Sequence, residues 1–195
     1  MKKICKICLL SAAAFLLLCG CGKLFDTKEE EISSSQDIAV SSSPETTEAA
    51  AAVTFEGLDM TGNTVSSDIF SASKLTMVNV WATYCNPCLR EMPGLGELAG
   101  EYDPAEFQII GIISDVQEGA DQKTMDYASG LIQRTGADYT HLVLNESVYY
   151  ALLTDVSAVP TTFFIDEEGV ILDTVIGSMD KSTWEEKINA LLEEQ

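Results

Sequence analysis

The stretch Leu75-Thr76-Met77-Val78-Asn79-Val80-Trp81-Ala82-Thr83-Tyr84-Cys85-Asn86-Pro87-Cys88 decides how this chain folds. Its first seven residues are mostly apolar and β-branched, which predicts a buried strand. A helical pattern follows from residue 86 to about residue 102, with Pro87 in the first turn, where its missing N–H costs nothing. The two cysteines therefore fall at a junction between a strand and a helix.

This position has a chemical consequence for the cysteine pair. Unpaired backbone N–H groups and the helix dipole at a helix N-terminus favour a thiolate over a thiol, so Cys85 is the expected nucleophile. Cys88 follows one turn later and can close a disulfide that releases a bound partner. We interpret the pair as a redox dithiol that exchanges disulfides with other proteins.

Three other interpretations of the pair remain open at this stage. A structural zinc site usually needs four ligands, and after Cys21 the sequence offers one cysteine pair and one histidine, His141. An inert disulfide across so short a loop would add little stability. The cysteines could also be two reduced core residues. We expect the redox pair, with no metal and with the Cys85–Cys88 disulfide as the only redox group.

The amino terminus has the pattern of an export signal. A short basic region precedes an apolar stretch at residues 9–18, which is too short for a membrane span of about 20 residues. Leu18-Cys19-Gly20-Cys21 resembles the lipobox of bacterial lipoproteins, which implies cleavage before Cys21 and a lipid on its thiol. We expect a lipoprotein signal peptide at 1–20 and a domain outside the cytoplasm, anchored to the membrane of the cell envelope. An uncleaved amino-terminal anchor is the alternative.

Residues 21–52 have a different composition. They are rich in Ser, Thr, Glu and Ala without an apolar period, and such a segment cannot bury enough surface to offset its ordering entropy. We expect a lipidated, disordered tether that ends where the globular domain, 53–195, begins. The net charge of −20 disfavours binding to nucleic acid and to anionic lipid, so membrane contact is expected through the lipid on Cys21.

The globular part alternates between strand and helix patterns. A hairpin is expected from Val53 to Val65, and the chain ends in an amphipathic helix that starts near Met179. Between them the expected strands are 75–81, 106–114, 140–144, 161–166 and 170–176, and the expected helical segments are 67–70, 86–102 with a kink at Pro93, 121–134 and 147–153. This order predicts an α/β domain with a sheet covered on both faces.

From Val53 to Glu194 the chain resembles the TlpA/ResA group of thioredoxin-fold proteins, which are membrane-tethered thiol-disulfide oxidoreductases. The resemblance is carried by Trp81 four residues before Cys85, the C-x-P-C motif, Pro93, the segment Ala158–Asp166 and the helix at 121–134. It implies a thioredoxin fold, with a central mixed sheet flanked by helices, an N-terminal β-hairpin and a central helical insertion.

The resemblance also implies roles for individual residues. Pro160 would be a cis proline packed against the dithiol, and the backbone of Val159 would pair with an incoming extended peptide. An ordinary trans proline at a strand start is the alternative. Glu91 would take the proton from Cys88 during attack on the mixed disulfide, and its alternative is a solvated helix residue.

Three further positions concern substrate and proton transfer. Asn79 stands where thioredoxin has a buried aspartate, so it cannot accept a proton, and the resemblance leaves that role to Glu91 or to water. Tyr84 stands where cytosolic thioredoxins have a second tryptophan, and we expect it beside the disulfide, contributing to partner choice. Trp81 completes the expected substrate-contacting set of Trp81, Tyr84 and Val159.

The implied partners are a disulfide-containing exported protein, such as apocytochrome c or methionine sulfoxide reductase, and a membrane thiol carrier of the CcdA/DsbD type. The same motif serves disulfide-forming oxidants, so the direction of transfer stays open. A peroxidase is disfavoured, because peroxiredoxins share the fold but place Pro and Thr where this chain has Val78 and Ala82. A non-catalytic binding lipoprotein is the remaining alternative.

Overall fold

The computed structural model describes residues 51–195. The expected signal peptide at 1–20, the lipid attachment at Cys21 and the tether up to residue 50 lie outside the described residues. Within residues 51–195, no helix has both the length and the apolar character needed to cross a bilayer.

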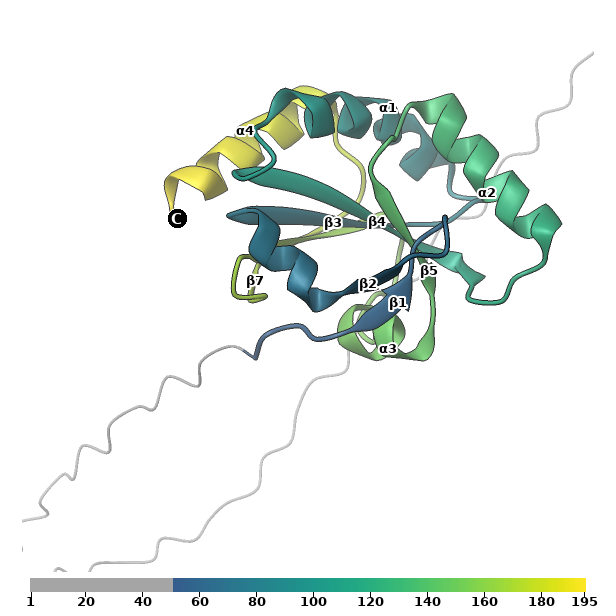
Figure 1. The fold of residues 1–195 in the computed structure, drawn as a ribbon. Helices are drawn as coiled ribbons and strands as arrows, with labels where there is room; N and C mark the ends of the chain where they lie inside the picture. The colour runs from purple at the N-terminus through teal and green to yellow at the C-terminus, as the bar shows by residue number, and fades with distance from the viewer. Residues whose placement is uncertain (1–50) are drawn as a thin grey trace, which may run out of the picture. The chain divides into compact units, whose positions relative to one another are not determined.

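A five-stranded mixed sheet forms the centre of the domain (Figure 1), in the order β5-β4-β3-β6-β7. The central strand β3 is parallel to β4 and antiparallel to β6, while β4 and β5 run parallel and β6 and β7 antiparallel. The strands are β3 (Leu75–Trp81), β4 (Phe107–Gln117), β5 (Thr140–Leu144), β6 (Thr161–Asp166) and β7 (Ile171–Ile176). The expected mixed sheet is confirmed.

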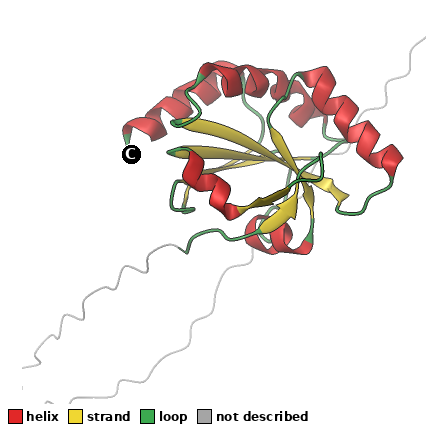
Figure 2. Cartoon of the chain, viewed as in Figure 1, coloured by secondary structure: helices red, strands yellow, loops and turns green. Residues whose placement is uncertain are grey.

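Helices cover both faces of this sheet, as Figures 1 and 2 show. The long helices lie along one face, and the short helical segments lie with the hairpin on the other. The long helices are α1 (Asn86–Glu101), α2 (Gln122–Thr135) and α4 (Lys181–Glu193); the opposite face carries η1 (Ser67–Ala72), α3 (Glu146–Val148) and the strands β1 (Glu56–Leu58) and β2 (Thr64–Ser66).

The alternation of side chains along β3 decides which residues meet the helices. Val78 and Val80 belong to the core on the side of η1 and α3. Met77 and Trp81 belong to the cores beneath α1, α2 and α4. Because strand side chains alternate between faces, Asn79 points to the same side as Met77 and Trp81, towards α1. This parity places a polar side chain beneath the helix that carries the cysteines.

Two helix ends follow the capping chemistry of the sequence. The Asp121 side chain accepts a hydrogen bond from the backbone N–H of Thr124 and begins α2, and Gly136 ends that helix in a left-handed conformation with φ 66°. The Asp180 side chain caps α4 in the same way, through the N–H of Thr183. The expected starts of these helices are therefore displaced by only one or two residues.

The structure differs from the expected hairpin in its first strand. β1 covers three residues rather than the whole segment from Val53, and residues 53–55 run as an extended segment whose Val53 N–H bonds to the Gly169 oxygen at 2.8 Å. At the other end, the Asp59 carboxylate accepts hydrogen bonds from the N–H groups of Thr61 and Asn63. This carboxylate stabilises the turn after β1, and only three residues of β1 remain to pair with β2.

Two other elements differ from expectation in extent. A bulge between Ile113 and Gln117 lets β4 continue three residues past the expected end. The segment expected as one short helix is α3 followed by a π-helical turn, η2 (Tyr149–Leu153). α1 covers nearly the expected range and, as expected, contains Pro93 inside it.

Candidate active site

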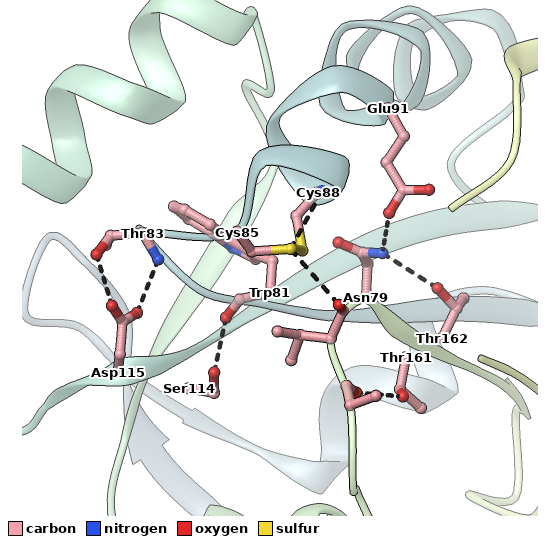
Figure 3. Close-up of a disulfide and its surroundings, with 12 residues drawn as sticks. Asn79, Trp81, Thr83, Cys85, Cys88, Glu91, Ser114, Asp115, Thr161 and Thr162 are labelled. Atoms are coloured by element: carbon pink, nitrogen blue, oxygen red, sulfur yellow. Dashed lines mark hydrogen bonds between the residues drawn. A yellow bond between two sulfur atoms is a disulfide. The ribbon is translucent and has the colours of Figure 1, made fainter. Parts of the chain in front are cut away.

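Cys85 and Cys88 are joined in a disulfide at the start of α1 (Figure 3). Cys85 is the N-cap residue, and its sulfur lies 3.2 Å from the backbone nitrogen of Cys88, which donates a hydrogen bond to it. The Cys85 carbonyl accepts the N–H of Leu89 at 3.1 Å. The first cysteine thus sits where the helix presents free N–H groups, the arrangement that stabilises a thiolate.

The two sulfur-bearing residues differ in their access to solvent. Cys85 is 5% exposed, whereas Cys88 is 0% exposed and lies with Met92 on the buried face of α1. An incoming group can therefore reach only the first cysteine.

A cis peptide bond joins Val159 to Pro160, as expected, and the alternative of a trans bond is wrong. The backbone oxygen of Val159 lies 3.6 Å from the Cys85 sulfur, so this loop borders the disulfide directly. Val159 also lines a shallow pocket of about 250 Å³ together with Tyr84 and Tyr149. Tyr84, the residue before Cys85, is 73% exposed and lines this pocket.

The loop between β3 and Cys85 is held by the end of β4. The Asp115 carboxylate accepts hydrogen bonds from both the backbone N–H of Thr83, at 2.9 Å, and its hydroxyl, at 2.5 Å. The Ser114 hydroxyl donates to the Trp81 carbonyl at 3.0 Å, and Figure 3 shows both pairs beneath the cysteines. These bonds fix the approach of the chain to the helix N-terminus.

Glu91 lies on the buried face of α1 itself and is 5% exposed, so the alternative of a solvated helix residue is wrong. Its side chain accepts hydrogen bonds from Asn79 Nδ2 at 3.1 Å, from the Met179 N–H at 3.2 Å and from Trp184 Nε1 at 3.3 Å. Burial nevertheless outweighs these three donors and raises the pKa of Glu91 to about 7. A carboxyl in this state can gain or lose a proton near neutral pH.

The expected substrate contact of Trp81 is wrong. The Trp81 indole is 0% exposed and lies beneath the disulfide. The indole Nε1–H donates to His141 Nδ1 at 3.1 Å, and His141 Nε2 bonds to the Ala137 carbonyl at 2.9 Å. Nε2 therefore carries the histidine proton, and Trp81 supports the disulfide from below without touching the surface.

The comparisons with known proteins agree with this geometry. Residues 49–174 match the AhpC/TSA family. The chain belongs to the AhpC/TSA family. It is 29% identical over 116 residues to the thioredoxin-like protein YneN of Bacillus subtilis, with 60% of this chain and 64% of the relative covered. It is 31% identical over 113 residues to the thiol-disulfide oxidoreductase ResA of Halalkalibacterium halodurans, with 58% and 60% covered.

A solved structure confirms the expected fold. A thioredoxin-family thiol:disulfide interchange protein from Chlorobium tepidum superposes with a TM-score of 0.62 at 22% identity, over 73% of this chain and 96% of the other. This likeness confirms the thioredoxin fold, and the ResA relative confirms the expected TlpA/ResA resemblance. The chain spans about three fifths of the length of the curated relatives it matches.

Two residues that support the disulfide region, His141 and Asp115, could not be assigned a role from the sequence. In the sequence His141 was considered only as the one histidine available to a zinc site. A lone imidazole inside the apolar strand β5 is nevertheless a signal for a buried hydrogen-bond partner. Burial lowers its pKa to about 4, so it is neutral and can accept the Trp81 hydrogen bond. Asp115 offered no signal, because its contact with Thr83 depends on strand pairing. In the part of the chain described here, no cluster of three or more His, Cys, Asp or Glu side chains is placed to hold a metal ion.

Proposed function

We propose that this chain is an extracytoplasmic thiol-disulfide oxidoreductase that reduces disulfides in exported proteins. The observation that carries the proposal is the Cys85–Cys88 disulfide at the N-terminus of α1, where Cys85 keeps 5% exposure and Cys88 has none, with the Val159 carbonyl 3.6 Å from the Cys85 sulfur. A nucleophile within reach of solvent and a fully buried resolving thiol suit two-step disulfide exchange.

The reaction begins from the reduced pair. The Cys85 thiolate attacks one sulfur of the substrate disulfide, forms a mixed disulfide and expels the other substrate sulfur as a thiolate, which takes up a proton. Cys88 then loses its proton and attacks the Cys85 sulfur, which breaks the mixed disulfide and expels the second substrate thiolate. Two electrons pass to the substrate, and the Cys85–Cys88 disulfide remains.

Glu91 acts as the general base in the second step. It follows Cys88 by three residues on α1, so both side chains lie on the buried face of the helix. Its pKa of about 7 gives a carboxylate that is partly ionised at neutral pH and can receive the Cys88 proton directly or through water.

The substrate binds as an extended segment across the Val159 loop. The backbone of Val159 is available beside the reacting sulfur, and the pocket between Tyr84 and Tyr149 accepts an apolar side chain from the segment. Exposed tyrosines supply large contact area at low entropic cost. Candidate substrates are apocytochrome c and an oxidised methionine sulfoxide reductase.

The remaining parts of the proposal concern location and electron supply. A lipid on Cys21 holds the domain at the outer side of a cell-envelope membrane through the 21–52 tether, and a membrane thiol carrier of the CcdA/DsbD type returns electrons to the disulfide. A strongly acidic chain with net charge −20 supports a lipid-based attachment rather than electrostatic binding to anionic lipid, and disfavours nucleic acid as a partner. Substitution of Cys21 by Ser should move the protein from the membrane fraction to the soluble fraction.

Reduction of insulin by the full chain, with dithiothreitol as electron source, tests the activity. Wild type should accelerate the reaction, and Cys85→Ser should be inactive because it lacks the attacking sulfur. Cys88→Ser should accumulate a mixed disulfide with insulin. Activity retained in Cys85→Ser refutes the mechanism, and a biological function retained in the double variant would favour a non-catalytic binding lipoprotein.

The redox potential of the pair decides the direction. A potential near that of thioredoxin, about −270 mV, supports a reductant, whereas a value near −120 mV identifies an oxidant that forms disulfides. A peroxidase remains disfavoured, since Val78 and Ala82 are buried apolar residues at the positions where peroxiredoxins use Pro and Thr.

A further inference from the structure

The side chain of Asn79 contains a buried oxygen that accepts no hydrogen bond from any protein group in residues 51–195. Its amide nitrogen, in contrast, is fully used. Nδ2 donates to Glu91 Oε1 at 3.1 Å and to Thr162 Oγ1 at 3.1 Å. This pairing favours the orientation of the amide when Glu91 is ionised, because the opposite orientation would set the amide oxygen against the oxygen of the Glu91 carboxylate.

The position of Asn79 directs this free oxygen towards the cysteines. Asn79 lies on the face of β3 that α1 covers, and its nitrogen is committed to Glu91, one turn beyond Cys88 on α1. Figure 3 shows the amide between Glu91 and the disulfide, with its nitrogen towards the carboxylate and its oxygen end turned towards the sulfur atoms. Both Asn79 and Cys88 are 0% exposed, so bulk solvent reaches neither side chain.

An unpaired buried carbonyl oxygen is costly, and its cost depends here on the redox state. A disulfide sulfur carries no hydrogen and cannot donate to it. Reduction by a dithiol breaks the Cys85–Cys88 bond, oxidises the donor to its own disulfide, and delivers two electrons and two protons to the two sulfurs. The Cys88 sulfur then carries an S–H group, a weak donor, on the side of β3 towards which the Asn79 oxygen points, and this oxygen accepts from no other group in residues 51–195.

We propose that Asn79 is a positioning residue of the dithiol, whose Oδ1 accepts a hydrogen bond from the Cys88 thiol in the reduced protein while Nδ2 continues to hold Glu91. This inference rests on the redox function proposed above and deepens it. The bond exists only after reduction, so Asn79 favours the reduced form. The same amide holds the Cys88 thiol through Oδ1 and the Glu91 carboxylate through Nδ2. The thiol is therefore oriented before its proton is removed.

Equilibration of the full chain with glutathione measures the first consequence. After acid quenching and alkylation, trypsin releases residues 75–90 as one peptide that carries both cysteines, separate from the cysteines near the amino terminus. Asn79→Leu, which replaces the amide by an apolar group of similar size, should lower the equilibrium constant for reduction about fivefold, the typical net effect of one hydrogen bond. A fivefold change corresponds to a potential about 20 mV more negative.

Thr162→Val is the matched control. It removes the other partner of Asn79 Nδ2 while keeping nearly the same shape and leaving Oδ1 in place, so its equilibrium constant should stay within about twofold of wild type. An equal shift in both variants, or no shift in Asn79→Leu, overturns the inference but leaves the redox function intact. A wild-type protein whose pair does not equilibrate with glutathione at all overturns both.

The infrared S–H stretching band of Cys88 gives a second readout, and its position in wild type and Thr162→Val does not require the Leu variant to fold. It is assigned in the reduced full chain by its loss in Cys88→Ser. The band should lie at lower wavenumber than that of a thiol dissolved in an alkane, should keep that position in Thr162→Val, and should move towards the alkane value in Asn79→Leu. A wild-type band at the alkane position refutes the hydrogen bond.

Discussion

Glu91→Gln tests the electrostatics of the site through protein stability. The pKa of Glu91 rises from an ordinary value of 4.5 to about 7 because burial disfavours its charged form more than its three hydrogen-bond donors favour it. The native carboxyl therefore binds its proton more tightly than the unfolded chain does. The stabilisation by the protonated group is complete below about pH 4.5 and is lost as the pH rises through 7.

The size of the effect follows from this rise. One pKa unit corresponds to about 1.4 kcal/mol, so the ionised carboxylate costs roughly 3 kcal/mol of stability above pH 7 compared with acid solution. Glutamine cannot ionise and does not incur this cost. The free energy of unfolding of Glu91→Gln minus that of wild type should thus increase by roughly 3 kcal/mol between acid and alkaline solution.

Urea unfolding of both proteins, monitored by circular dichroism at about pH 4 and about pH 8 with the disulfide intact, measures this difference. His141, whose lowered pKa of about 4 acts in the opposite direction, is present in both proteins and cancels. Glu97→Gln, at an exposed position on the same helix, controls for the loss of one negative charge. A difference between Glu91→Gln and wild type that stays constant with pH refutes the reasoning, because lost hydrogen bonds alone do not titrate.

Two further predictions concern packing and partner binding. Gly111→Ala should destabilise the fold by about 2 kcal/mol in thermal or urea unfolding, because the new Cβ would lie 2.1 Å from His141 Nδ1. Gly100→Ala on α1, where a Cβ meets no atom within 4 Å, should instead be neutral or stabilising, and equal losses in both variants would refute this account. Tyr84→Ala should lower kcat/KM for insulin about threefold to tenfold while leaving the rate with a small disulfide such as oxidised glutathione unchanged. Tyr127→Ala removes another exposed tyrosine on α2, and an equal loss there would show that Tyr84 makes no specific contact.

Much of the fold could be predicted from local sequence. The apolar run at 75–81, the Asp and Gly residues that flank α2 and the C-x-P-C motif each indicate their element through propensity and capping, which depend on residues close in sequence. The cis bond before Pro160 was expected only through the family resemblance, because an isolated Val-Pro dipeptide is compatible with both isomers.

The extents of several elements could not be predicted in this way. The bulge that lengthens β4 depends on its pairing with β5, and the short β1 depends on where the Asp59 carboxylate finds donors.

By itself the sequence determined the chemistry proposed for this protein: the expected nucleophile Cys85, its partner Cys88 and the helix N-terminus at which the pair lies. These follow from residues within one turn of each other. Tertiary structure alone decided which other groups share that chemistry. Strand parity and packing bury Glu91 against Asn79, and they turn Trp81 inward onto His141. Burial sets both the proton affinity of a carboxyl and the cost of an unpaired oxygen, and it is a property of the assembled core rather than of any local segment.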